Sequence, residues 1–209
     1  MLRSVNAQDV YDYVRKKIIF KELFPGARII EEDLAAELHT SRTTVRAGIM
    51  RLHYEGLVVV QRNRGAFVAQ PNWVDMNHVY TARRVLELEV ARLALPRITD
   101  EAIARMDRLQ EKLIALEQRY SMAEYVKLNQ AFHWELVQAA DNEYLEKFLR
   151  ELFNKSAIFL IFYDNSNSGK LSIKSHQRLL DALHARDEAA LLDAVVGDIK
   201  CATDCITIS

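Results

Sequence analysis

The stretch EEDLAAELHTSRTTVRAGIMRLHYEG, residues 31–56, decides the fold of this chain. Its apolar residues fall at helical spacing in two short segments, Leu34, Ala35 and Leu38 in the first and Val45, Ile49 and Leu52 in the second. Two such helices can pack across a tight turn, and the second then begins with outward polar side chains, which are Arg42, Thr43, Thr44 and Arg46. Arginine offers a two-pronged donor to guanine and a charge to phosphate, and threonine offers a hydroxyl and a methyl. The stretch predicts a DNA-reading helix-turn-helix, with an ordinary helical hairpin as the alternative.

The residues that follow favour the DNA-reading interpretation. Residues 57–60, LVVV, are strand-like, and residues 66–69, AFVA, return as a second strand after a basic turn. Arg62 and Arg64 are expected at the tip of this hairpin, within reach of phosphates or the minor groove. Gly65 permits a positive φ or a close backbone approach there. The pattern is that of a helix-turn-helix followed by a β-hairpin wing.

These motifs, in this order and spacing, resemble the DNA-binding domain of the GntR-type bacterial transcription regulators. The resemblance rests on the runs PGARI, DLAAEL, SRTTVRAGIMRL, EGLV and NRGAFV and covers nearly all of residues 7–69. This chain departs from the family in two places. Thr44 stands where many members carry Pro, and Glu32 replaces an arginine that commonly contacts DNA. A carboxylate at position 32 would repel phosphate, so we expect an operator that differs from the family's usual one.

Composition and charge agree with a two-domain protein that binds DNA at one end. The chain has 209 residues, of which 50% are hydrophobic and 27% charged, as in a soluble globular protein. Residues 1–70 hold 11 Lys/Arg against 8 Asp/Glu, whereas the remainder is acidic. The polar start is unlike a secretory signal, and the longest apolar run, residues 157–163, is too short to cross a bilayer. We therefore expect a cytoplasmic protein with no membrane partner.

The chain beyond residue 74 is expected to be entirely helical, because Pro96 is its only proline and Leu, Ala, Glu and Arg recur at helical spacing. The predicted helices are 74–96, 99–120, 122–140, 143–164, 170–185 and 187–206, with Thr99, Asn142 and Asp187 as caps or first-turn residues and a polar loop at 165–169. In the first part, a helix is predicted over 9–20 and a third strand over 28–30. The expected domains are 1–70 for DNA binding, a linker at 71–77, and 78–209 for effector binding and dimerisation.

The second part resembles the FCD ligand-binding domain of the FadR subfamily. The resemblance rests on RRVLE at residues 83–87, on NQAFHWELVQAADNEYL from Asn129 and on SHQRLLDALHARDEAAL from Ser175. It implies a mainly α protein, in which an N-terminal winged helix-turn-helix with a small β-hairpin wing precedes an all-helical, FCD-like bundle.

The same resemblance implies a divalent metal site. Many members bind the ion through an Asp and a His four residues apart and two later His, and the corresponding positions here are Asn129, His133, His176 and Asp198. Asn129 replaces the usual Asp, and Asp198 replaces the last His. The family implies zinc, manganese, iron or nickel, but two imidazoles and one carboxylate suit harder ions such as manganese, iron(II) or magnesium better than tight zinc. The alternative for each histidine is an ordinary hydrogen-bonded residue on a helix.

The resemblance also implies an effector site, formed by Arg83, Asn129, His133 and His176. Arg83 stands where family members present a guanidinium to the pocket, and its fork suits a carboxylate. The function expected is that of a homodimeric repressor on a pseudo-palindromic double-stranded operator, released by a small carboxylate. Two alternatives compete with it, namely a metal-dependent hydrolase that uses His133, His176 and Asp198, and an effector-independent DNA-binding protein. The hydrolase lacks a nucleophile elbow, a phosphate loop and an H-E-x-x-H motif, so we expect no enzyme.

Overall fold

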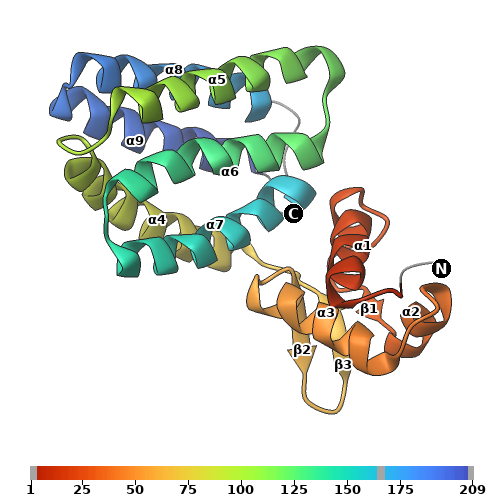
Figure 1. The fold of residues 1–209 in the computed structure, drawn as a ribbon. Coiled ribbons are helices and arrows are strands. Elements are labelled where there is room, and N and C mark those ends of the chain that lie inside the picture. The colour runs from red at the N-terminus through yellow and green to blue at the C-terminus, as the bar shows by residue number, and fades with distance from the viewer. Residues whose placement is uncertain (1–3, 164–167, 207–209) are drawn as a thin grey trace. The chain divides into compact units, whose positions relative to one another are not determined.

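The structure, a computed structural model, describes residues 4–163 and 168–206 (Figure 1). Its contacts divide the chain into two compact units, Met1–Pro71 and Asn72–Ser209. We call them the N-terminal unit and the C-terminal unit. None of the helices in the described ranges combines the length and the apolar character needed to span a membrane.

Three helices build the core of the N-terminal unit: α1 (Ala7–Ile19), α2 (Glu31–Glu37) and α3 (Arg42–Tyr54). The apolar faces of α1 and α3 are buried against each other. Gly48 allows this close approach, because a Cβ at that position would lie 2.8 Å from the Cβ of Val10. Ser41 caps α3 by accepting a hydrogen bond from the Thr44 backbone N–H. The second helix of the motif therefore begins at Arg42, the first of its predicted DNA-reading residues. The predicted helix-turn-helix is confirmed.

The wing is a three-stranded antiparallel sheet in the order β1-β3-β2, made of β1 (Arg28–Ile29), β2 (Val58–Gln61) and β3 (Gly65–Val68). Its hairpin pairs Val58 with Val68 and Gln61 with Gly65. Both Asn63 and Gly65 take positive φ in the turn, at 61° and 98°, as a tight hairpin connection requires. The hairpin wing and the third strand predicted over 28–30 are therefore present.

In the described part of the C-terminal unit there are six α-helices, with a short 3₁₀ turn, η1 (Glu117–Arg119), between the second and third. They are α4 (Trp73–Ala94), α5 (Asp100–Leu116), α6 (Met122–Ala139), α7 (Glu143–Tyr163), α8 (Ser168–Ala185) and α9 (Glu188–Asp204). Thr99 and Asp187 are the N-caps of α5 and α9, and the Asn142 side chain accepts from two backbone N–H groups at the start of α7. The predicted all-helical domain and its caps are confirmed.

Two local predictions are refined by the structure. The helix predicted from residue 74 overlaps the expected linker at 71–77, and it begins at Trp73 because Asn72 and Asp75 form a capping box with hydrogen bonds of 2.9 Å in each direction. Of the polar loop predicted at 165–169, residues 165–167 lie outside the described residues, and Ser168 and Gly169 belong to α8.

The helices of the C-terminal unit enclose a large apolar core, and a smaller apolar cluster lies between α4, α7 and the C-terminal end of α9. Helix α4 packs against α6, α7 and α9, α5 packs against α6 and α8, and α8 runs beside α9 (Figure 1). Phe132, Met106, Leu183 and Leu191 are fully buried at its centre. This arrangement surrounds one interior region with four helices, α4, α6, α8 and α9, each of which contributes a polar side chain to it.

Candidate DNA interface and metal centre

The start of α3 presents the polar residues predicted to read DNA. Arg42, Thr43 and Arg46 are exposed. Thr44 is half-buried, and its hydroxyl lies 2.8 Å from that of the cap residue Ser41. Three of the four predicted side chains are therefore accessible to a ligand outside the protein, while Thr44 also serves the helix cap.

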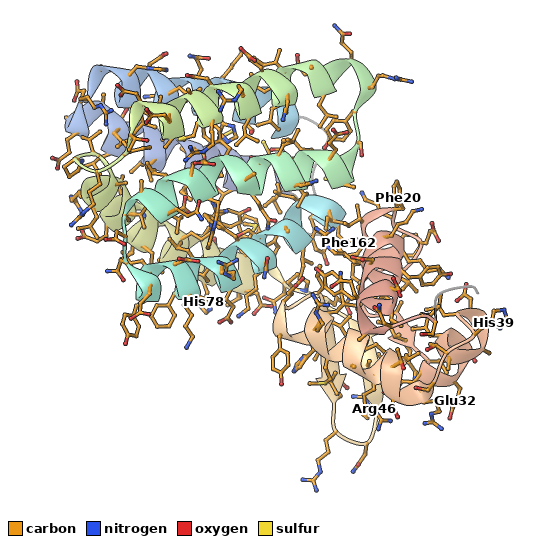
Figure 2. All side chains as sticks on the ribbon, viewed as in Figure 1. Phe20, Glu32, His39, Arg46, His78 and Phe162 are labelled. Carbon is orange, nitrogen blue, oxygen red and sulfur yellow. The ribbon has the colours of Figure 1, made fainter. Side chains whose placement is uncertain are left out.

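Arg42 and Arg46, the two arginines in the first half of α3, are ion-paired with the first turn of α2, which the sequence reading did not foresee. The Arg46 guanidinium donates twice to the Glu31 carboxylate, from Nε at 3.1 Å and from Nη2 at 2.6 Å. Arg42 Nη1 lies 2.7 Å from Glu32 Oε1. The hydrogen bond from Arg46 lowers the pKa of Glu31, so this carboxylate is charged at neutral pH. Figure 2 labels Glu32 and Arg46 along the same edge of the unit.

The wing arginines are placed differently. Arg62 and Arg64 are exposed in the hairpin turn, beside Gly65. The Arg64 guanidinium lies 5.8 Å from the centroid of the Phe67 ring, and neither arginine has an ion-pair partner within the described ranges. Both side chains therefore keep an uncompensated positive charge at the tip of the wing.

In the C-terminal unit, the structure brings together three of the four residues expected to bind metal. His133 of α6 and His176 of α8 have their Nε2 atoms 3.3 Å apart. The Asp198 carboxylate of α9 lies 3.5 Å from His133 Nε2 and 3.8 Å from His176 Nε2. Donors bound to one ion at about 2.1 Å lie roughly 3 Å from one another. The three groups are therefore spaced as the ligands of a single metal ion would be, and all three are buried.

The remaining predicted residues, Asn129 and Arg83, border this cluster. Asn129 lies one turn before His133, and its Oδ1 accepts a hydrogen bond of 3.4 Å from Ser172. Arg83, His133, Asn129 and Asp198 line one cavity of about 20 Å³. A cavity of this size holds an ion or one water molecule, whereas an organic acid requires more room.

Four residues around the cluster were missed by the sequence reading. Arg83 Nε donates at 2.7 Å to Glu87, and both side chains are buried. Their i, i+4 spacing on one helix was visible in the sequence and predicts such a pair. Ser172 and Ser175 contact the cluster, the latter by donating to Asp198, and Phe132 stacks on the His176 ring at 4.1 Å between centroids. The Ser175–Asp198 and Phe132–His176 contacts arise between different helices, so no local sequence signal marks them, whereas Ser172 lies one turn before His176 on α8.

Burial keeps both imidazoles of the cluster neutral. It lowers the pKa of His133 to about 3, with further lowering by His176 and Arg83, and it lowers the pKa of His176 as well. A neutral imidazole nitrogen is the form that binds a metal ion. Burial also works to lower the pKa of Arg83, but Glu87 and Tyr80 outweigh it, so this guanidinium stays charged.

The lowered histidine pKa predicts acid sensitivity of the C-terminal unit. We expect its free energy of unfolding to fall between pH 7 and pH 5, because unfolded histidine has a pKa near 6.5 and takes up protons that folded His133 refuses. The loss approaches about 1.4 kcal/mol per pH unit for each such histidine. Trp73 and Trp134, the two tryptophans of the chain, both lie in this unit, so tryptophan fluorescence in urea with EDTA measures it. If the free energy of unfolding of His133→Gln falls with pH as steeply as that of the wild type, buried His133 is not the cause of the acid sensitivity.

Each of the two units matches a known protein family. Residues 6–68 match the bacterial regulatory proteins of the gntR family, and residues 78–199 match the FCD domain. The Nta operon transcriptional regulator of Aminobacter aminovorans is 33% identical over 84% of this chain and 82% of its own length. The HTH-type transcriptional repressor RspR of Escherichia coli K12 is 24% identical over 92% of this chain and 85% of its own. The solved structure of E. coli McbR/YncC has the same fold, with a TM-score of 0.76 at 22% identity over 96% of this chain and 95% of that one.

Proposed function

The chain belongs to the GntR family of bacterial regulatory proteins and carries an FCD domain, and from that premise we propose that it is a repressor released from its operator by a small carboxylate. DNA-binding transcription regulation is the function of the family, which is not one of enzymes, so the hydrolase alternative falls. We assign residues 1–70 to DNA binding and residues 78–209 to effector binding and dimerisation.

One observation supports the effector proposal, namely that a buried arginine, two neutral imidazoles and the Asp198 carboxylate lie together in the helical interior, with Glu87 paired to the arginine. A single carboxylate from Asp198 leaves a divalent ion with open coordination positions, which a ligand carboxylate can fill. Manganese or iron(II) fits this donor set best, with His133, His176 and Asp198 as its protein ligands and Asn129 beside them. The cavity is too small for an organic acid, so effector binding must enlarge it.

The position of Arg83 suggests how the site controls DNA binding. Arg83 lies on α4, which begins at Trp73, directly after the N-terminal unit ends at Pro71. A ligand that contacts both Arg83 and the ion held by α6, α8 and α9 changes how α4 packs against those helices. Such a change reaches the start of α4 and thereby alters how the DNA-binding unit is presented. An effector-independent protein would leave this buried polar cluster without a role.

We further propose that the protein acts in the cytoplasm as a homodimer on an inverted repeat. Two copies related by a two-fold axis present two identical recognition helices, and the DNA sequence must mirror that symmetry. A monomer in sedimentation at micromolar concentration, together with a footprint that lacks dyad symmetry, would overturn this part.

Arg42→Ala tests the DNA interface. The operator is first obtained as the duplex that the wild-type protein selects from a random-sequence pool. We expect the variant to bind this duplex about 1–3 kcal/mol more weakly and to lose preference at one base pair, since Arg42 is exposed at the first turn of α3. Arg92→Ala is the matched control, because it removes an exposed, ion-paired arginine from the C-terminal unit. Fluorescence anisotropy measures both affinities, and equal affinities for the two variants would refute the interface.

A further inference from the structure

The second arginine of the recognition helix is held in a fixed orientation by a carboxylate from the preceding helix. Glu31 accepts from Arg46 Nε and Nη2, which are the two donors on one side of the guanidinium. The Glu31 side chain is only 23% exposed, whereas that of Arg46 is 61% exposed. The carboxylate is therefore packed into the protein, and the guanidinium that it holds faces solvent.

This contact leaves a second donor edge of Arg46 available. A guanidinium has five N–H groups, and the pair with Glu31 uses the edge formed by Nε and Nη2. The edge formed by Nη1 and the other N–H of Nη2 has no hydrogen-bond partner among the residues that the structure describes. Two parallel N–H donors are what guanine O6 and N7 accept in the major groove. We propose that Glu31 is a positioning residue, which orients this free edge of Arg46 toward a guanine of the operator.

The same pair also limits attraction to DNA of any sequence. Sequence-independent binding depends on positive charges that neutralise phosphates, and the charge of Arg46 is already balanced by Glu31. Arg62 and Arg64 on the wing keep their charge and are suited to phosphates. Because it is paired with Glu31, Arg46 is suited to recognising a base, and phosphate binding depends on other residues.

Glu32 offers an internal comparison. Its contact with Arg42 is a single one of 2.7 Å, and the two side chains are 64% and 58% exposed. Such a pair balances charge without fixing an orientation. A purely structural role for Glu31 is the competing explanation, since acidic residues stabilise the first turn of a helix through its dipole. That role predicts a change in helix stability and no change in base preference.

The test uses the full-length protein, the duplex that the wild type selects from a random pool, a scrambled duplex, and single G·C to A·T replacements of the selected duplex. Glu31→Gln removes the charge and keeps the side-chain shape, while Glu31→Asp keeps the charge and shortens the reach. Glu22→Gln is the control, because it removes one negative charge from an exposed residue of the same unit that contacts no arginine in the described structure. Thermal melting followed by circular dichroism checks that each variant is folded.

We expect both Glu31 variants to lose about tenfold in discrimination at one guanine and to keep their preferences elsewhere. Glu31→Gln should also bind the scrambled duplex more tightly, with a salt slope steeper by about one, whereas Glu31→Asp should keep the wild-type slope. Unchanged discrimination at every guanine, or an equal loss in Glu22→Gln, would overturn the proposal. This inference rests on the proposed function, which is specific operator binding. If the wild-type protein selects no sequence from the pool, both the proposed function and this inference are overturned. If it selects a sequence but the Glu31 variants discriminate at every guanine as the wild type does, only this inference is overturned.

Discussion

Glu87→Ala is expected to lower the free energy of unfolding of the C-terminal unit by about 3–5 kcal/mol. Arg83 and Glu87 are 5% and 6% exposed, and their side chains meet at 2.7 Å. Removal of Glu87 leaves a charged guanidinium buried among helices without the carboxylate that accepts its hydrogen bond, and arginine does not lose its proton to escape this penalty. Urea unfolding followed by tryptophan fluorescence measures the loss.

Two variants make the result specific to a buried charge. Glu89→Ala breaks the ion pair of Glu89 with Arg92, which is exposed on the same helix with its atoms 3.4 Å apart, and should cost less than about 1 kcal/mol. The double variant Arg83→Met/Glu87→Leu replaces the whole buried pair by apolar side chains and should recover most of the stability. If Glu87→Ala lowers the free energy of unfolding no more than Glu89→Ala does, Arg83 and Glu87 do not form a buried ion pair.

Loss of the ligand response with retention of operator binding is the second large effect that we expect. His133→Ala removes one of the three metal-spaced donors, and the stable double variant Arg83→Met/Glu87→Leu removes the guanidinium from the cavity. Since we propose that the other unit binds the operator, both variants should bind it as the wild type does. The wild-type response, about 5- to 150-fold in operator affinity, should disappear in both.

The control for this experiment is His184→Ala. His184 lies on α8 like His176, but it is exposed and pairs with Asp107 at 3.1 Å, away from the cavity. The operator affinity of the His184→Ala variant should therefore respond to the carboxylate as that of the wild type does. Treatment of the wild type with EDTA separates the two ways of holding the carboxylate, since a response that needs a metal ion is lost and one that needs only Arg83 remains. A normal response in both His133→Ala and the double variant would place the effector site elsewhere.

The sequence predicted most of the fold because local patterns determine most of it. Apolar spacing marks each helix, and the basic turn between two strand-like runs marks the wing. The start of α4 is also marked locally, because Asn72 and Asp75 stand at the spacing that a capping box requires.

The candidate sites were less predictable, because they depend on how helices approach one another. The matched family positions identified His133, His176 and Asp198, and the structure brings these three side chains together. No sequence pattern reveals that Glu31 reaches Arg46 fifteen residues later, since the angle between α2 and α3 decides it. The cavity volume likewise depends on packing, and at about 20 Å³ the cavity has to open if the proposed carboxylate is to enter.

The reciprocal coupling between operator and carboxylate tests most directly whether the helical unit controls DNA binding. Wild-type protein with manganese is titrated onto the selected duplex with and without the carboxylate that most raises its melting temperature, and the carboxylate is then titrated with and without the duplex. We predict that the dissociation constants of both ligands change by the same factor, about 5- to 150-fold, because coupling free energies are reciprocal. An operator affinity that no stabilising carboxylate changes would contradict a ligand-controlled regulator.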